Sequence, residues 1–178
     1  MAHTTQQPRL IDRRPLALSA IALVCLSVTV HVTAADQTGI RRVRAENPLL
    51  ADAIAQGVSR SATFRRLIEA IDATDGLVYV LDGRCGQGVR ACLHMSLELS
   101  GGNRLLRIVV NPRRAPGCEL LASIAHELQH ALEALGNPNV RTAFGLSSFF
   151  HQIGPEGPRR FETPEAIQRG VDEGKEAC

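Results

Sequence analysis

Two histidines and a glutamate within five residues provide the clearest chemical signal in this sequence. The stretch is His126-Glu127-Leu128-Gln129-His130. On a helix, His126 and His130 project from one face about one turn apart, so both imidazoles can reach a single metal ion. Glu127 is then turned aside from them, where a carboxylate can accept a proton from a water molecule at the ion. The spacing therefore predicts a hydrolytic zinc site.

The residues around this motif favour an amphipathic helix from about Cys118 to Leu135, which ends before Gly136, Asn137 and Pro138. Both imidazoles lie roughly opposite the centre of an aliphatic stripe, which consists of Leu121, Ile124, Leu128, Leu132 and Leu135. The stripe can pack on a sheet while the histidines face a cleft. The simpler alternative is a solvated helix face that carries two histidines and a glutamate without any function.

The elements before this helix predict a sheet of at least three strands. Leu77–Leu81 is a compact apolar run of strand type, and Ala91–Val110 is typical of a β-hairpin with its turn at Ser100–Asn103. The first hairpin strand alternates, with one face formed by Ala91, Leu93, Met95, Leu97 and Leu99 and the other by Cys92, His94, Ser96 and Glu98. Residues 41–76 predict two short helices, broken near Gly57, with Ser61 as the N-cap of the second.

The segment His126–His130, placed after a mixed sheet, resembles the active-site motif of the zincin metallopeptidases. The resemblance covers about Leu77 to Leu135 and is closest to a minimal member, similar to short secreted bacterial proteins. It implies an α+β, zincin-like fold, in which a small antiparallel or mixed sheet packs on the motif helix between N- and C-terminal helices. The extended metzincin pattern is excluded because Glu133 and Gly136 stand where that pattern has its glycine and third histidine.

The resemblance also implies a third zinc ligand from a later element, usually a glutamate in the gluzincin group. Glu162 is the first choice, because "ETPEA" is similar to gluzincin segments in which the glutamate precedes a helix and a small residue, here Ala166, follows one turn later. Glu133 lies too far along the same helix to join His126 on one ion. The other candidates are Glu165, His151, Glu156, Glu173 and Glu176. Thr163 and Pro164 form a strong N-cap and N1 pair.

The first 35 residues are typical of a secretory signal peptide. Arg9, Arg13 and Arg14 precede the uncharged run Leu16–Val32, and Val32 and Ala34 suit signal peptidase. An uncleaved membrane anchor is the alternative, since such a run is at the lower limit for spanning a bilayer. Cleavage would leave a single domain, residues 36–178, in the periplasm or outside the cell.

Charge and composition argue against two classes of protein, disordered chains and nucleic-acid-binding proteins. A hydrophobic content of 44% is enough for a sizeable core and excludes a disordered chain. The chain has 20 basic and 18 acidic residues, so losing three arginines and Asp12 with the signal leaves a formal net charge of zero. No nucleic-acid partner is expected.

Four cysteines remain after residue 35, namely Cys85, Cys92, Cys118 and Cys178. In an exported chain this even number favours two disulfides, most simply Cys85 with Cys92 and Cys118 with Cys178. A four-cysteine zinc site is the competing interpretation, but the sequence contains no C-x-x-C pair.

The predicted function is secreted zinc-dependent hydrolysis of peptide bonds, with one zinc ion on His126, His130 and Glu162 and with Glu127 as general base. Two alternatives stay open: a non-enzymatic, disulfide-stabilised binding module in which zinc is structural or absent, and hydrolysis of an amide in the cell wall. His94 and Tyr79 are weaker candidates for substrate contact and oxyanion stabilisation, because strand positions more often serve structure.

Overall fold

The computed structural model describes residues 41–86, 88–154 and 161–177, whose elements belong to one unit, Thr38–Cys178. The expected signal peptide lies outside the described residues. The elements follow the order β1 (Val43–Ala45), α1 (Pro48–Arg60), α2 (Ala62–Asp72), β2 (Gly76–Asp82), β3 (Ala91–Ser100), β4 (Asn103–Val110), α3 (Cys118–Gly136), α4 (Ala143–Ile153) and α5 (Pro164–Ala177). The α+β class is confirmed. No helix within the described ranges has the length and apolar character needed to cross a bilayer.

The four strands form one mixed sheet in the order β1-β2-β4-β3. β1, β2 and β4 are parallel, whereas β3 is antiparallel to β4 and forms one edge of the sheet. The predicted hairpin is confirmed, and Gly101 and Gly102 at its tip both have positive φ, +55° and +84°. Such angles suit the tight turns whose twist matches that of antiparallel strands.

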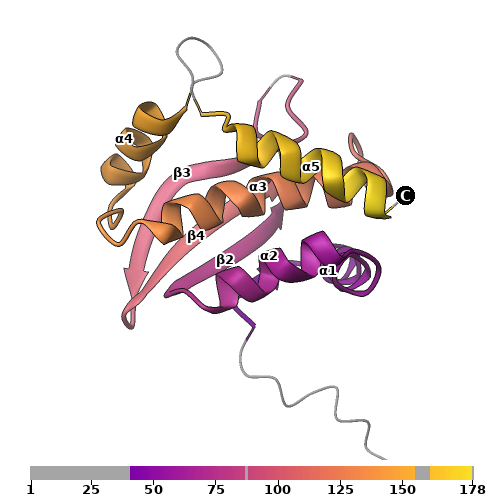
Figure 1. Ribbon diagram of the computed structural model, residues 1–178, viewed down its shortest axis with the longest axis horizontal. Coiled ribbons are helices and arrows are strands. Elements are labelled where there is room, and N and C mark those ends of the chain that lie inside the picture. The colour runs from indigo at the N-terminus through magenta and orange to yellow at the C-terminus, as the bar shows by residue number, and fades with distance from the viewer. Residues whose placement is uncertain (1–40, 87, 155–160, 178) are drawn as a thin grey trace, which may run out of the picture. The chain divides into compact units, whose positions relative to one another are not determined.

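The helices cover one face of this sheet. Val78 and Val80 of β2 and Leu106 and Ile108 of β4 are fully buried, and the residues between them are partly exposed. Figure 1 shows α3 lying along the sheet and α5 lying along α3, and the contacts between α3 and α5 are among the most extensive in the fold. The motif helix is therefore held between the sheet and the C-terminal helix.

The N-terminal part corrects one expectation and adds a strand. The helix does not break near Gly57 but continues to Arg60, because the missing side chain makes room for Phe64: a Cβ atom at Gly57 would lie 2.9 Å from Cγ of that ring. The two helices separate at Ser61, and the predicted N-cap is confirmed, since the Phe64 N–H donates to the Ser61 Oγ over 3.0 Å. The strand β1 was not predicted.

Strand β3 also departs from simple alternation. Its register against β4 shifts between His94 and Leu97, so that Met95 and Ser96 are extra residues opposite a continuous partner strand. Such a bulge bends an edge strand and re-aims its side chains. Leu99, expected on the apolar face, is 52% exposed because it lies close to the hairpin tip.

The C-terminal end of α3 is fixed by a buried arginine. Arg104 of β4 is 3% exposed, and its guanidinium pairs with Asp75. It also donates to four carbonyl oxygens at and just after the helix end, those of Ala134, Leu135, Asn137 and Val140. A cation there satisfies carbonyls that lack intrahelical partners and interacts favourably with the helix dipole.

Candidate metal centre

The two motif histidines project from α3 toward the same point, as the spacing predicts. Their ring centroids are 4.9 Å apart and the ring planes are nearly perpendicular, at 81°. The side chain of His130 is 7% exposed and packs edge-on against Phe150 of α4, with centroids 5.4 Å apart. The side chain of His126 is 21% exposed. One imidazole is thus held in the core and the other borders solvent.

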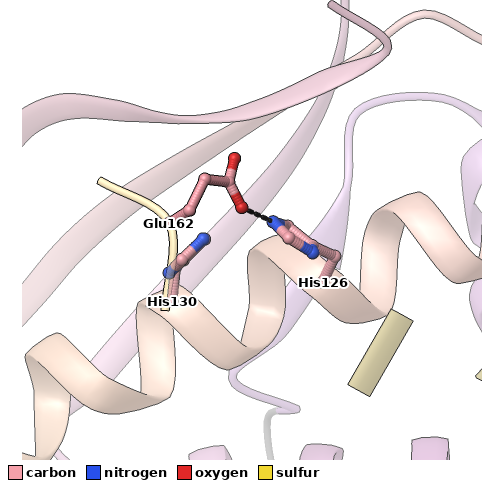
Figure 2. Close-up of side chains that lie close together, drawn as sticks. All are labelled: His126, His130 and Glu162. Atoms are coloured by element: carbon pink, nitrogen blue, oxygen red, sulfur yellow. Dashed lines mark ion pairs between the residues drawn. The ribbon is translucent and has the colours of Figure 1, made fainter. Parts of the chain in front are cut away.

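Glu162 reaches this point from the segment that leads into α5. Its Oε2 lies 3.1 Å from Nε2 of His126, the pair joined by the dashed line in Figure 2. One ligand atom from each of His126, His130 and Glu162 lies within 4.8 Å of the others. Among the described residues, this is the only group of three or more potential ligands that meets that criterion.

His130 is oriented by a carboxylate one turn further along α3. Its Nδ1 lies 3.3 Å from Oε2 of Glu133, and an ionised carboxylate can only accept, so the proton of the neutral ring is on Nδ1. The other oxygen of Glu133 accepts a hydrogen bond from the Thr163 hydroxyl over 2.8 Å. Nε2 of His130 is therefore the nitrogen available to a metal ion.

His126 is oriented by α5. The backbone of Ala166 lies near its ring and contributes to the rise in the pKa of His126. A Cβ atom at Gly170, one turn further, would lie 3.6 Å from Nδ1 of His126, which shows how closely the helix approaches this side of the ring. The carboxylate of Glu162 pairs with Nε2 of His126. Nε2 of His126 and Nε2 of His130 are therefore the two nitrogens that face the candidate metal position.

These groups fit a zinc ion. Two imidazole nitrogens and one carboxylate oxygen are a donor set of catalytic zinc sites, and zinc distances of about 2.0–2.1 Å place ligand atoms about 3.3 Å apart on a tetrahedron. The His126–Glu162 separation of 3.1 Å is close to that edge. The carboxylate of Glu133 behind His130 is a further feature of metal-binding histidines, which usually have such a hydrogen-bond partner.

The charge balance of the site is consistent with a bound cation. Burial lowers the pKa of His126, but the hydrogen bond to Glu162 and the charges of Glu127 and Glu162 outweigh it, so the pKa is raised above its usual value. The carboxylates thus favour positive charge between Nε2 and Glu162, whether it is a proton or a metal ion.

Glu127 lies beside the three ligand candidates and close to Leu93 of β3. Its side chain is buried, and burial raises the pKa of its carboxyl against the opposing effects of the two imidazoles and a backbone hydrogen bond from Leu93. A buried carboxyl beside a site for a Lewis acid is suited to accept and return a proton.

The other ligand candidates lie elsewhere. Glu165 and His151 are exposed, and the His151 ring packs against Phe161 with centroids 5.2 Å apart. The carboxylate of Glu176 accepts the Thr63 N–H, and Glu173 accepts from the Ser61 hydroxyl, so both stabilise the start of α2. Glu156 lies outside the described residues.

Of the two weaker candidates, only His94 shares a hollow with His130, Glu127 and Glu162. The Tyr79 hydroxyl accepts a hydrogen bond from Arg44 over 3.2 Å on the partly exposed face of the sheet, which does not support a role as oxyanion stabiliser. His94 is exposed on β3, with Nδ1 2.8 Å from the Ser96 hydroxyl.

Two hollows give access to the site from different sides. One, of about 570 Å³, includes Arg90, Glu119 and Ser123 in its lining. The other, of about 310 Å³ and called the apolar hollow here, includes Leu93, Met95, Phe150 and Phe161. Glu127 and Glu162 line both. A substrate can therefore extend in two directions from the candidate ligands.

The predicted disulfide between Cys85 and Cys92 is present and anchors the loop before β3 beside the apolar hollow. Its formation excludes a four-cysteine zinc site. Cys178, the expected partner of Cys118, lies outside the described residues, but Sγ of Cys118 is 3.8 Å from the carbonyl oxygen of Ala177.

Comparison of the chain with models of protein families, with curated proteins and with solved structures finds no match. The functional assignment therefore depends on the residues of the site.

The contribution of Glu133 was not predicted. The sequence excludes it as a direct ligand on distance, and the structure places it behind His130 as a hydrogen-bond acceptor. Its spacing of three residues from His130 was the available signal, because residues i and i+3 are neighbours on a helix surface.

Proposed function

We propose that this protein is a zinc-dependent metallopeptidase, in which His126, His130 and Glu162 hold one zinc ion. The observation that best supports the proposal is the convergence of these three side chains, two from α3 and one from a segment about thirty residues later, within 4.8 Å of one another. The carboxylate of Glu133 behind His130 and the buried carboxyl of Glu127 beside the two imidazoles add to this support.

The proposed reaction is hydrolysis of a peptide bond. Zinc, when bound, supplies a Lewis acid that polarises the scissile carbonyl and makes a water molecule acidic near neutral pH. Glu127 accepts a proton from the attacking water and delivers it to the leaving amine nitrogen, so it ends the cycle as a carboxylate. His126, His130 and Glu162 position the ion, and Glu133 keeps His130 in the tautomer that offers Nε2.

An extended substrate would bind along β3. This strand pairs only with β4 in the described sheet, and the buried carboxyl of Glu127 lies beside its Leu93 backbone. Backbone hydrogen bonds to a free sheet edge can fix a peptide in register and bring one carbonyl to the ligand cluster. The apolar hollow, with Met95 and Phe150 in its lining, then accepts one apolar side chain.

We further propose that the fold is zincin-like and that the protein acts after export. An antiparallel edge strand beside the motif helix supports the first point. The disulfide supports the second, because such bonds persist in oxidising compartments. The signal peptide proposed for residues 1–35 is consistent with it.

The deciding experiment measures zinc by mass spectrometry in protein exported with its disulfides formed. We expect one zinc ion per chain in the wild type, loss of zinc in His126→Ala and Glu162→Ala, and retention in the matched control Glu165→Ala. Retention in Glu162→Ala would remove that residue from the ligand set.

Absence of zinc from the wild type after reconstitution would contradict the proposal and leave a non-enzymatic binding module. If zinc binds, protein, peptide and purified cell-wall substrates are assayed in parallel. If only the cell-wall substrate were cut, zinc-dependent amide hydrolysis would remain the proposed chemistry, and a cell-wall amide would take the place of the peptide as the proposed substrate.

A further inference from the structure

A large hollow lies away from the ligand cluster, where two parallel strands end. β2 and β4 are neighbours, with Asp82 opposite Val110, so the chain leaves both strands at the same edge of the sheet. Residues 83–86 follow β2, and Asn111, Arg113 and Arg114 follow β4; together they border a hollow of about 770 Å³. Ligands commonly bind beyond the carboxyl ends of parallel strands, because the loops that leave them converge there.

Three arginines dominate the lining of this hollow, which we call the arginine hollow. Arg84 comes from the first loop, and Arg113 and Arg114 come from the second. All three are exposed, and none has an ion-pair partner within 4.0 Å among the described residues. Asp82 is the only acidic residue in the lining. The lining of the hollow therefore carries an excess of positive charge.

The arginine hollow adjoins the candidate metal centre through the disulfide-anchored loop. Cys85 lines the arginine hollow and also the apolar hollow, which in turn is bordered by Glu127 and His130. The bond from Cys85 to Cys92 fixes this loop to the start of β3. A chain lying in the apolar hollow can thus continue past Cys85 toward the three arginines.

We propose that the arginine hollow binds an acidic segment of the peptide substrate, an inference that rests on the proposed peptidase function. Each guanidinium can form paired hydrogen bonds with a carboxylate. An extended acidic segment fits better than a single phosphate group, because the hollow is large and its arginines are exposed on two loops. Interactions of this kind add selectivity and speed association.

The test measures direct binding and hydrolysis separately. A fluorescent peptide with a run of Asp and Glu is compared by anisotropy with a peptide in which Asn and Gln replace them, using the Glu127→Gln variant so that neither is cut. We expect the acidic peptide to bind more tightly and to lose about tenfold in affinity in Arg113→Glu/Arg114→Glu, with weaker binding at higher salt. Arg41→Glu is the matched control. Arg41 is exposed and precedes β1, which is parallel to β2, so it lies at the amino ends of these strands and the arginine hollow lies at the carboxyl ends.

Hydrolysis by the enzyme with Glu127 intact supplies the second measurement. The same double variant should lower kcat/KM for acidic substrates about tenfold and leave neutral substrates unchanged. Equal affinity for the two peptides, an unchanged double variant, or competition by inorganic phosphate as strong as that of the acidic peptide would overturn the proposal. Binding of the acidic peptide is also measured with His126→Ala. Because this variant disrupts only the proposed metal centre, it separates the hypothesis of an acidic-peptide site from the hypothesis of a zinc peptidase. Acidic-peptide binding without any hydrolysis by the wild type would reject the peptidase function and leave only an anion site.

Discussion

Nδ1 of His130 lies 3.3 Å from Oε2 of Glu133, while the other oxygen of that carboxylate accepts a hydrogen bond from Thr163 over 2.8 Å. Thr163 also caps α5, since its hydroxyl oxygen accepts the Ala166 N–H over 3.2 Å, as the sequence predicts. One chain of hydrogen bonds therefore links a candidate ligand on α3 to the helix that follows Glu162. The position of Glu162 and the orientation of His130 depend on the same contacts.

Glu133→Gln should weaken zinc binding by about 10- to 100-fold, because a neutral amide orients the His130 ring less firmly and makes its Nε2 less basic. The measurement is competition for zinc with a chromophoric chelator. Glu165→Gln, an exposed substitution on α5, is the control and should leave the affinity unchanged. An unaltered affinity in Glu133→Gln would show that the hydrogen bond does not act on the metal.

Glu127→Gln should leave zinc content unchanged and lower kcat by about 10²- to 10⁴-fold, the usual contribution of a general base. Gln has nearly the same shape and can keep the place of Glu127 beside Leu93, but it cannot accept a proton from water. Zinc content and peptide hydrolysis are measured on the same preparation. Full activity in this variant would reject the mechanism.

Arg104→Met should lower the free energy of unfolding by about 3 kcal/mol, since it removes a buried cation and leaves four carbonyl oxygens near the end of α3 without that donor. Denaturant unfolding gives the value. The matched control is Arg107→Met on the same strand, where the arginine pairs with an exposed glutamate, Glu98. That loss should stay below about 1 kcal/mol. Equal losses in the two variants would contradict the proposed role of Arg104.

The Asp75–Arg104 pair should make stability sensitive to acid. The hydrogen bond from Arg104 lowers the pKa of Asp75 below its model-peptide value of 3.8, against the opposing effect of burial. A carboxyl with a depressed folded-state pKa contributes stability above its unfolded pKa and loses it as the pH falls through the folded value. We therefore expect unfolding curves recorded below about pH 4 to show a smaller pH dependence in Asp75→Asn than in the wild type. The same pH dependence of stability in Asp75→Asn and in the wild type would show that Asp75 does not contribute to acid sensitivity.

The sequence alone predicted the two histidines of the candidate site and most of the helices and strands. Local rules were sufficient for the motif helix, the hairpin, the N-caps Ser61 and Thr163 and the short-range pair Cys85–Cys92, because each depends on residues close together in the chain. The same spacing rules place His126 and His130 on one face of a helix.

Only the tertiary structure decided which distant groups meet. Glu162, Glu165 and His151 were alternatives in sequence, and the packing of α5 on α3 brings Glu162 alone among them to the two imidazoles. The same contacts place the Ala166 backbone behind His126, and helix geometry places Glu133 behind His130. The arginine hollow likewise exists because β2 and β4 are parallel neighbours although β3 separates them in sequence. Such relationships depend on long-range packing, which local propensity and periodicity do not encode.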